Sequence, residues 1–186
     1  AARARLCAQV DAHVLGLALQ AIAADGRGRC INFAAQSLGF SSFVAHATQM
    51  IELAQPHAGR LWIDLPESLA LERPELVRDV ALRWGAAGVQ VGLEHVGEAL
   101  ARVPGLPDMG LKVVRVDSCF IDGAAVPGAA DLRRHLRALV QVAHGLGMSI
   151  TAEGVRDAAD LQQVWSLGFD AATGPAVQPM SPQYSG

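Results

Sequence analysis

Six polar or acidic residues recur where short apolar segments of this sequence give way to longer helical patterns. They are Asn32, Asp64, Glu94, Asp117, Glu153 and Thr173. Amide and carboxylate oxygens bind hard divalent cations, and carboxylates also transfer protons, so a set of them in one place could bind a metal or activate water. Alternatively, each residue caps the helix that follows it, because Asp and Asn are common at such junctions. Six occurrences in series favour a shared site.

The elements that would position these residues alternate along the chain. Apolar segments with β-strand character predict strands at 30–34, 61–65, 88–93, 112–116 and 149–152, with a weaker one near Ala171. Helical spacing of apolar residues predicts helices at 12–24, 43–54, 74–84, 131–144 and 158–167. This alternation is typical of βα units with a mostly parallel sheet. In a β/α barrel the carboxyl ends of the strands lie on one face, so the six polar residues would line one pocket.

Composition narrows the class of protein. The chain has 186 residues, 51% hydrophobic content and a net charge of −3, which predicts one soluble domain. Its longest apolar segment, 10–24, is interrupted by Asp11, His13 and Gln20, so no membrane-spanning helix is expected. Three cysteines without metal-type spacing indicate reduced thiols and a cytoplasmic setting. Scattered basic residues argue against binding of a DNA or RNA duplex. The lack of an initiating Met and of a signal peptide predicts a fragment of a larger protein.

Several stretches resemble, in order and spacing, the signature blocks of the EAL domain family. They are INFAAQSL, LWIDLPESL, VGLEHVG, VVRVDSCFI, MSITAEGV and LGFDAATGPAVQP. The resemblance covers residues 1–180, leaves 181–186 as a flexible tail, and implies an incomplete TIM-like (β/α) barrel. Members of the family bind the bacterial second messenger cyclic di-GMP, and the active ones hydrolyse it with two divalent metals. GLEHVG and ATGPAV are most similar to the degenerate EAL domains of LapD-type membrane receptors.

Compared with the family pattern, several metal-binding positions are altered. Asn32 matches the family's ligand Asn, whereas Asp64 stands where a Glu is expected and is shorter by one methylene. Glu94 and His95 replace two adjacent Asp residues. An imidazole does not bridge two hard, oxygen-preferring cations as a carboxylate does. We therefore expect the metal site to be lost.

The remaining positions lead to the same expectation. Glu153 is retained, but Arg156 replaces the acidic residue expected three positions later, and Thr173 stands where the family has Gln. Arg115 replaces a Lys that orients the attacking water in the family, and its planar fork differs from a compact ammonium. The EAL tripeptide does not occur before Asn32. Relative to a typical barrel of ~250 residues, roughly the first quarter is absent, with the first strands and the first metal ligand.

The resemblance thus implies a catalytically inactive EAL domain that acts as a cyclic di-GMP receptor or regulatory module. We expect a cytoplasmic domain of an inner-membrane signalling protein that self-associates and contacts the other domains of its parent. No catalytic residue, metal ligand or cofactor is assigned, and neither Mg²⁺ nor Mn²⁺ is expected. The expected ligand-binding residues are Asn32, Asp64, Glu94, Asp117, Glu153, Gly154, Thr173, Gly174, Pro175 and Pro179.

Two alternatives stay open. The first is an interaction or dimerisation module that no longer binds nucleotide, because the open edge of an incomplete barrel can pair with another chain. The second is a weak cyclic di-GMP phosphodiesterase, which would need the ligands that this sequence has lost.

Overall fold

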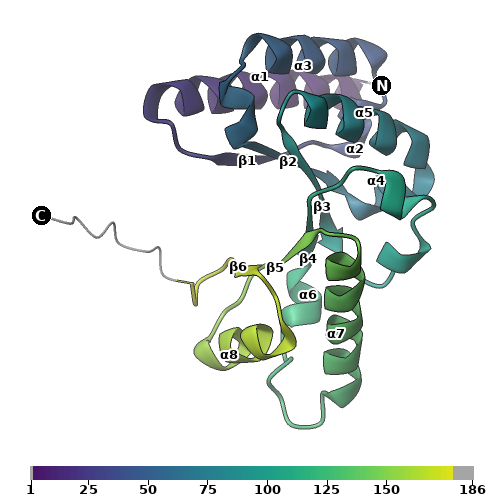
Figure 1. The fold of residues 1–186 in the computed structure, drawn as a ribbon, viewed down its shortest axis with the longest axis vertical. Helices are drawn as coiled ribbons and strands as arrows, with labels where there is room; N and C mark the ends of the chain where they lie inside the picture. The colour runs from purple at the N-terminus through teal and green to yellow at the C-terminus, as the bar shows by residue number, and fades with distance from the viewer. Residues whose placement is uncertain (1, 178–186) are drawn as a thin grey trace, which may run out of the picture.

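The fold is an open, curled parallel sheet with helices packed on its outer face (Figure 1). The computed structural model describes residues 2–177. The six strands follow one another in the sheet in chain order, and every pair is parallel. They are β1 (Arg29–Asn32), β2 (Leu61–Pro66), β3 (Gln90–Val96), β4 (Val113–Val116), β5 (Ser149–Ala152) and β6 (Ala171–Ala172). β1 and β6 each pair with one neighbour among the described strands, so the predicted incomplete (β/α) barrel is confirmed.

The longer helices form where the apolar spacing predicts them; α1 precedes the first strand, and the other four connect successive strands. They are α1 (Ala2–Asp25), α3 (Ser41–Leu53), α5 (Pro74–Ala86), α7 (Ala130–Gly145) and α8 (Ala158–Leu167). The short helices were not predicted, because one or two turns give too few residues for a period to be recognised. They are α2 (Ala35–Leu38), α4 (Glu67–Glu72), α6 (Ser118–Ile121), and the 3₁₀ turns η1 (His57–Arg60), η2 (Leu100–Arg102) and η3 (Leu106–Asp108). The predicted boundary after residue 180, the tail 181–186 and Pro179 lie outside the described residues.

The two faces of the sheet differ in chemistry because side chains alternate along each strand. The outer face is apolar, and Ile63, Leu93 and Val114 are fully buried on it against the helices. Trp84 of α5 is also fully buried, and its Nε1 donates a hydrogen bond of 2.9 Å to Thr48 Oγ1. The inner face carries the polar residues, so the pattern that builds the core also places them together.

Helix α1 corrects the expectation that no segment could span a membrane. By length and composition alone, α1 is apolar enough to cross one. In the structure, however, Leu15 and Ile22 on one face of α1 are fully buried in the core. Asp11 is also buried, and its carboxylate accepts a hydrogen bond of 2.9 Å from the backbone N–H of Ala34. One face of α1 therefore packs as a core helix, whereas Leu6 and Val10 are exposed.

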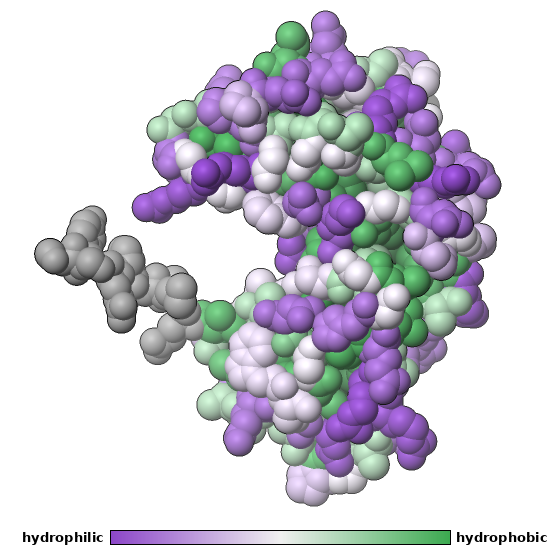
Figure 2. Space-filling model, viewed as in Figure 1, coloured by the Kyte–Doolittle hydropathy of each residue, from purple (hydrophilic) through white to green (hydrophobic). Residues whose placement is uncertain are grey.

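The curled sheet leaves the molecule hollowed on one side. Figure 2 shows a deep recess between the part that holds α1 and α3 and the part that holds α8. Polar residues appear on the walls of this recess and apolar residues behind them. The inner face of the sheet is thus open to solvent from the side on which β1 and β6 lie.

Candidate functional site

The site is built around a buried ion pair between Asp64 of β2 and Arg115 of β4. Asp64 is fully buried, and its Oδ2 accepts a hydrogen bond from Arg115 Nε. The Cys30 thiol of β1 also donates to Asp64 Oδ2 at 3.0 Å, and Arg115 Nη2 lies 3.2 Å from Cys30 Sγ. Three strands therefore contribute to one polar cluster on the inner face of the sheet.

Gly92 of β3 makes room for this pair. Asp64 and Gly92 are partners in the β2–β3 register, and a Cβ at Gly92 would lie 2.6 Å from Asp64 Oδ1 and overlap Val113. Any larger residue would therefore force the carboxylate or β4 to move. Asp64 Oδ1 is buried without a hydrogen-bond partner. A buried carboxylate oxygen in that state is costly, which makes the counter-charge of Arg115 more important.

Glu94, two residues after Gly92 and on the same face of β3, also belongs to the cluster. Asn32 Nδ2 of β1 donates a hydrogen bond to Glu94 Oε2 across β2. Glu94 is 7% exposed, and this burial raises its pKa; His95 acts in the opposite direction, whereas Asp64 adds to the rise. Asp64 lies within β2, as in the predicted range 61–65, whereas Glu94 lies within β3 and not after it, because β3 continues to Val96.

A bulge in β3 directs His95 toward Asp117. The β3–β4 register shifts between Leu93 and Val96, and His95 has a positive φ of 54°, which few non-glycine residues adopt. His95 Nδ1 lies 2.8 Å from Asp117 Oδ2, and this hydrogen bond raises the pKa of His95. Asp117 also caps α6, because its Oδ1 accepts from the backbone N–H of Cys119 at 2.9 Å. That N–H and His95 lower the pKa of Asp117, so here the capping role and the site role coexist.

Glu153 and Gly154 follow β5 and complete the polar cluster. Glu153 is half-buried, and this burial raises its pKa, while the positive charges of Arg115 and His95 act against the rise. Gly154 has φ +68°, and a Cβ there would lie 2.6 Å from the Cβ of Ser118. Glycine is therefore required at this position both by conformation and by space.

The predicted residues after β6 form an adjoining turn. The backbone N–H of Thr173 donates to Ala152 O, and Thr173 O accepts from Val155 N, both at 2.8 Å. Gly174 has φ +130°, and a Cβ there would overlap the Val155 backbone. Thr173 and Pro175 are exposed. This turn is tied to the segment that follows Glu153, but it makes no described hydrogen bond to the carboxylate cluster.

The oxygen atoms of the cluster do not fit a pair of divalent ions as they are arranged. Asp64 Oδ2 accepts from both Arg115 and Cys30, and Glu94 Oε2 accepts from Asn32. Within residues 2–177, no group of three or more His, Cys, Asp or Glu side chains is placed to hold a metal ion. Each Mg²⁺ or Mn²⁺ ion would need several free oxygen ligands.

Sequence reasoning missed part of the cluster. The sequence predicts only a reduced thiol at Cys30, whereas in the structure the residue is partly exposed and its Sγ lies against Asp64 and Arg115. The sequence does hold a sign of this contact: Cys30 stands two residues before Asn32, so the two side chains lie on the same face of β1. Arg115 and His95 were recognised as substitutions but were not counted among the site residues.

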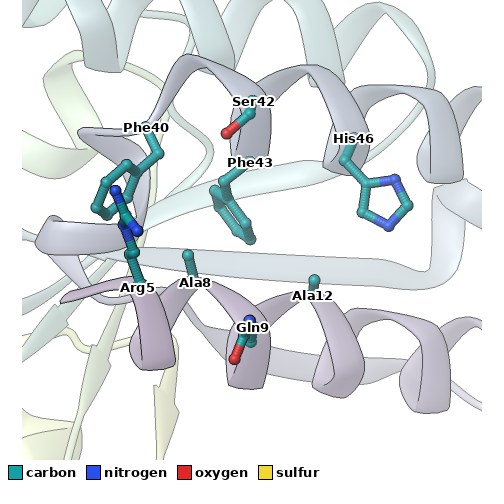
Figure 3. Close-up of a pocket in the computed structure, with 8 residues that line it drawn as sticks. All are labelled: Arg5, Ala8, Gln9, Ala12, Phe40, Ser42, Phe43 and His46. Carbon is teal, nitrogen blue, oxygen red and sulfur yellow. The ribbon is translucent and has the colours of Figure 1, made fainter. Parts of the chain in front are cut away.

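A second hollow lies away from this cluster, between α1 and α3. Its volume is about 650 Å³, and Figure 3 shows aromatic side chains of the α3 region facing α1 across it. The lining includes Arg5, Gln9, Phe40, Phe43 and His46. It contains no carboxylate among its lining residues, and we place the candidate site at the polar cluster because ionisable groups converge there.

The fold and site define an open (β/α) barrel protein with a carboxylate-rich cluster on the inner face of the sheet and at the carboxyl ends of its strands. The family model of the EAL domain matches residues 1–180, and the chain belongs to this family. It is 25% identical over 131 residues to the cyclic di-GMP phosphodiesterase PdeR of Escherichia coli, which covers 70% of this chain and 19% of PdeR. The chain spans 14% to 19% of the length of the curated relatives it matches.

Two solved structures illustrate the shared fold. The Xanthomonas citri FimX EAL domain in complex with c-di-GMP gives a TM-score of 0.80 at 20% identity, covering 95% of this chain and 72% of that chain. The Vibrio cholerae LapD S helix-GGDEF-EAL structure, bound to c-di-GMP, gives a TM-score of 0.81 at 19% identity, covering 90% of this chain and 41% of that chain. At these identities the likeness establishes the fold.

Proposed function

We propose that this chain is a catalytically inactive EAL domain that acts as a cyclic di-GMP receptor or regulatory module. The observation that carries the proposal is the engagement of Asp64 and Glu94 by protein donors, Arg115 and Asn32. Hydrolysis needs metal ions and an aligned water, whereas recognition needs only contacts to the bases and phosphates. Binding can therefore persist after turnover is lost.

The chemistry of the proposed site suits a guanine nucleotide. Carboxylate and amide oxygens, such as those of Glu153, Asp117 and Asn32, can accept hydrogen bonds from the N–H groups of a guanine edge. The guanidinium of Arg115 is suited to a phosphate. The recess in Figure 2 gives access to these groups. The proposed binding residues are those named from the sequence: Asn32, Asp64, Glu94, Asp117, Glu153, Gly154, Thr173, Gly174, Pro175 and Pro179.

We further propose that residues 1–180 form a regulatory domain on the cytoplasmic side of an inner-membrane signalling protein. The LapD likeness supports this, because that EAL domain is joined to a GGDEF domain and an S helix. The curated relatives are also several times longer than this chain.

One alternative function has its own supporting observation. Leu6, Val10 and Leu17 are about half exposed and recur at helical spacing on the outer face of α1. This stripe supports an interaction or self-association module without nucleotide. A weak phosphodiesterase is the remaining alternative, and it would require the carboxylates to release their present partners.

Calorimetric titration with cyclic di-GMP, with and without Mn²⁺, tests the proposal. Each mixture is then analysed by chromatography for the linear dinucleotide that hydrolysis would release. We expect saturable binding in both conditions and no product. Glu153→Gln should weaken binding at least tenfold, whereas Glu52→Gln, on the exposed face of α3, should leave it unchanged. Absence of binding at millimolar nucleotide, together with a concentration-dependent dimer, would favour the interaction module. Linear product would favour the enzyme.

A further inference from the structure

The outer face of α1 is an apolar surface that no described part of the structure covers. Leu6, Val10 and Leu17, which we call the outer stripe, are 59%, 51% and 52% exposed. They lie on the side of α1 opposite to Leu15 and Ile22, which are fully buried in the core. The outer stripe therefore points away from the sheet.

A groove between α1 and α3 extends this apolar surface. Its lining includes Gly16, Leu19, Met50 and Leu53, and Leu53 is 78% exposed. Among the described residues, four of the eight exposed large apolar side chains lie on these two helices. Apolar side chains that gather on one exposed face mark a contact with another molecule or with a membrane.

Cations stand at both ends of the outer stripe. Arg3 and Arg5 are exposed in the first turns of α1. At the other end, Arg27 is exposed just after the helix. Arg60 lies at the same end, because its Nη1 donates a hydrogen bond to Gly26 O.

Few carboxylates balance these cations. The acidic residues of α1 are Asp11, which is buried, and Asp25, which forms an ion pair with Arg29 at 2.5 Å. The neighbouring helix α3 adds one carboxylate, Glu52. The net charge of the whole chain is −3, so the positive charge around α1 is a local excess.

We infer that the outer face of α1 is a docking surface for an anionic lipid bilayer, with the helix lying parallel to the membrane plane. In such helices the apolar side chains enter the boundary between headgroups and acyl chains, and the cations bind lipid phosphates. By length and composition α1 is apolar enough to cross a membrane, but its core-packed face keeps it on the domain. The inference does not rest on nucleotide binding.

A second copy of the chain could also cover the outer stripe, but the charges oppose it. In a parallel pair of α1 helices, Arg3 and Arg5 would meet the same residues of the other copy. In an antiparallel pair they would meet the end that carries Arg27 and Arg60. Like charges that meet across an interface oppose association. The phosphates of a bilayer complement both ends at once.

The test is sedimentation of the full chain with large unilamellar vesicles, in the absence of nucleotide. We expect the protein to pellet with vesicles of equal parts phosphatidylglycerol and phosphatidylcholine, and to stay in solution with phosphatidylcholine alone. Raising NaCl from about 0.1 M to about 0.5 M should weaken binding at least about fivefold, because salt screens exposed charges.

One variant tests the apolar contribution. Replacing all three residues of the outer stripe by Gln should weaken binding at least about tenfold, because their burial in the bilayer is lost. The control variant combines Val126→Gln and Trp165→Gln, which remove exposed apolar side chains in the part of the molecule that holds α7 and α8 (Figure 1). It should bind as wild type does.

A second variant tests the charges. Arg3→Gln combined with Arg5→Gln should weaken binding at least about tenfold, because each arginine near an anionic surface contributes to the attraction. Arg134→Gln combined with Arg137→Gln removes two exposed arginines of α7 and should change nothing. Circular dichroism establishes that each variant is folded. If the stripe variant unfolds, the arginine variant decides the outcome.

Each result decides the inference. Wild type that does not pellet with phosphatidylglycerol vesicles would overturn it, and so would equal binding to both kinds of vesicle. Unchanged binding by a folded α1 variant would do the same. A concentration-dependent dimer in analytical ultracentrifugation, abolished by the stripe variant, would assign the outer stripe to a second copy. Since no nucleotide is present, failure here is distinguishable from failure to bind cyclic di-GMP.

Discussion

Arg115 on β4 and Asp64 on β2 form a buried ion pair that reaches across β3, at the level where β3 has Gly92. The pair joins strands that are not neighbours, and it exists because the intervening residue has no side chain. One substitution at any of these three positions should therefore disturb the whole cluster. The relationship leads to tests that do not depend on the identity of the ligand.

Breaking the buried pair should destabilise the fold strongly. Arg115→Met should lower the free energy of unfolding by about 3–5 kcal/mol, because it leaves the buried Asp64 carboxylate without its cationic partner. Urea unfolding measures this, and the double variant with Asp64→Asn should lose less than the sum of the single losses. Arg83→Met breaks an exposed pair with Asp79 and should cost at most about 1 kcal/mol. Additive losses at Arg115 and Asp64 would contradict the buried pair.

Gly154 should tolerate alanine less well than Gly147. Both have positive φ, at +68° and +71°, but a Cβ at Gly147 meets nothing within 4 Å, whereas one at Gly154 would press on Ser118. Gly147→Ala should therefore cost only the backbone strain of about 1–2 kcal/mol. Gly154→Ala should cost clearly more in the same thermal unfolding experiment. Equal costs would show that the Gly154–Ser118 approach is not tight.

The His95–Asp117 pair should make stability depend on pH. The hydrogen bond to Asp117 raises the pKa of His95 above 6.5, so its contribution is complete below 6.5 and is lost as pH rises through the higher folded value. The pKa of Asp117 is lowered, mainly by the Cys119 N–H, so its contribution is present above 3.8 and is lost as pH falls through the folded value. His95→Gln should therefore be more destabilising at pH 6 than at pH 9. An NMR titration that found the His95 pKa below 6.5 would refute this.

Cys30 should react slowly with thiol reagents although it is partly exposed. Burial, followed by the hydrogen bond and charge of Asp64, raises the pKa of Cys30 to about 12. At pH 8 only about one thiol in 10⁴ would be ionised, and the thiolate is the reactive form. In a background with Cys7→Ser and Cys119→Ser, iodoacetamide should modify Cys30 faster once Asp64→Asn removes the neighbouring charge. An unchanged rate would show that the Asp64 carboxylate does not control the reactivity of the Cys30 thiol.

The order of the strands and helices can be predicted from the sequence, because an element buried on one face has apolar residues at a regular spacing. All six strands lie within two or three residues of their expected ranges, since each has apolar residues on its outer face. The start of α1 was placed ten residues late, because the arginine-rich first turns interrupt the apolar pattern. The short helices contain too few residues to show a helical spacing of apolar residues.

Several residues of the cluster could be named from the sequence, but their contacts with one another could not. Asn32, Asp64 and Glu94 could be named from their positions near strand ends. The pairing of Asp64 with Arg115, and the space left by Gly92, depend on contacts between strands that are far apart in sequence. The bulge at His95 likewise depends on the register of β3 against β4. Such tertiary contacts have no signal in a single sequence.

The most direct test of the account is equilibrium dialysis of wild type against labelled cyclic di-GMP in excess EDTA. We predict saturable binding, one nucleotide per chain, with the nucleotide recovered intact. Binding that appears only when Mn²⁺ replaces EDTA, or recovery of linear dinucleotide under that condition, would contradict the claim that this site recognises its ligand without metals.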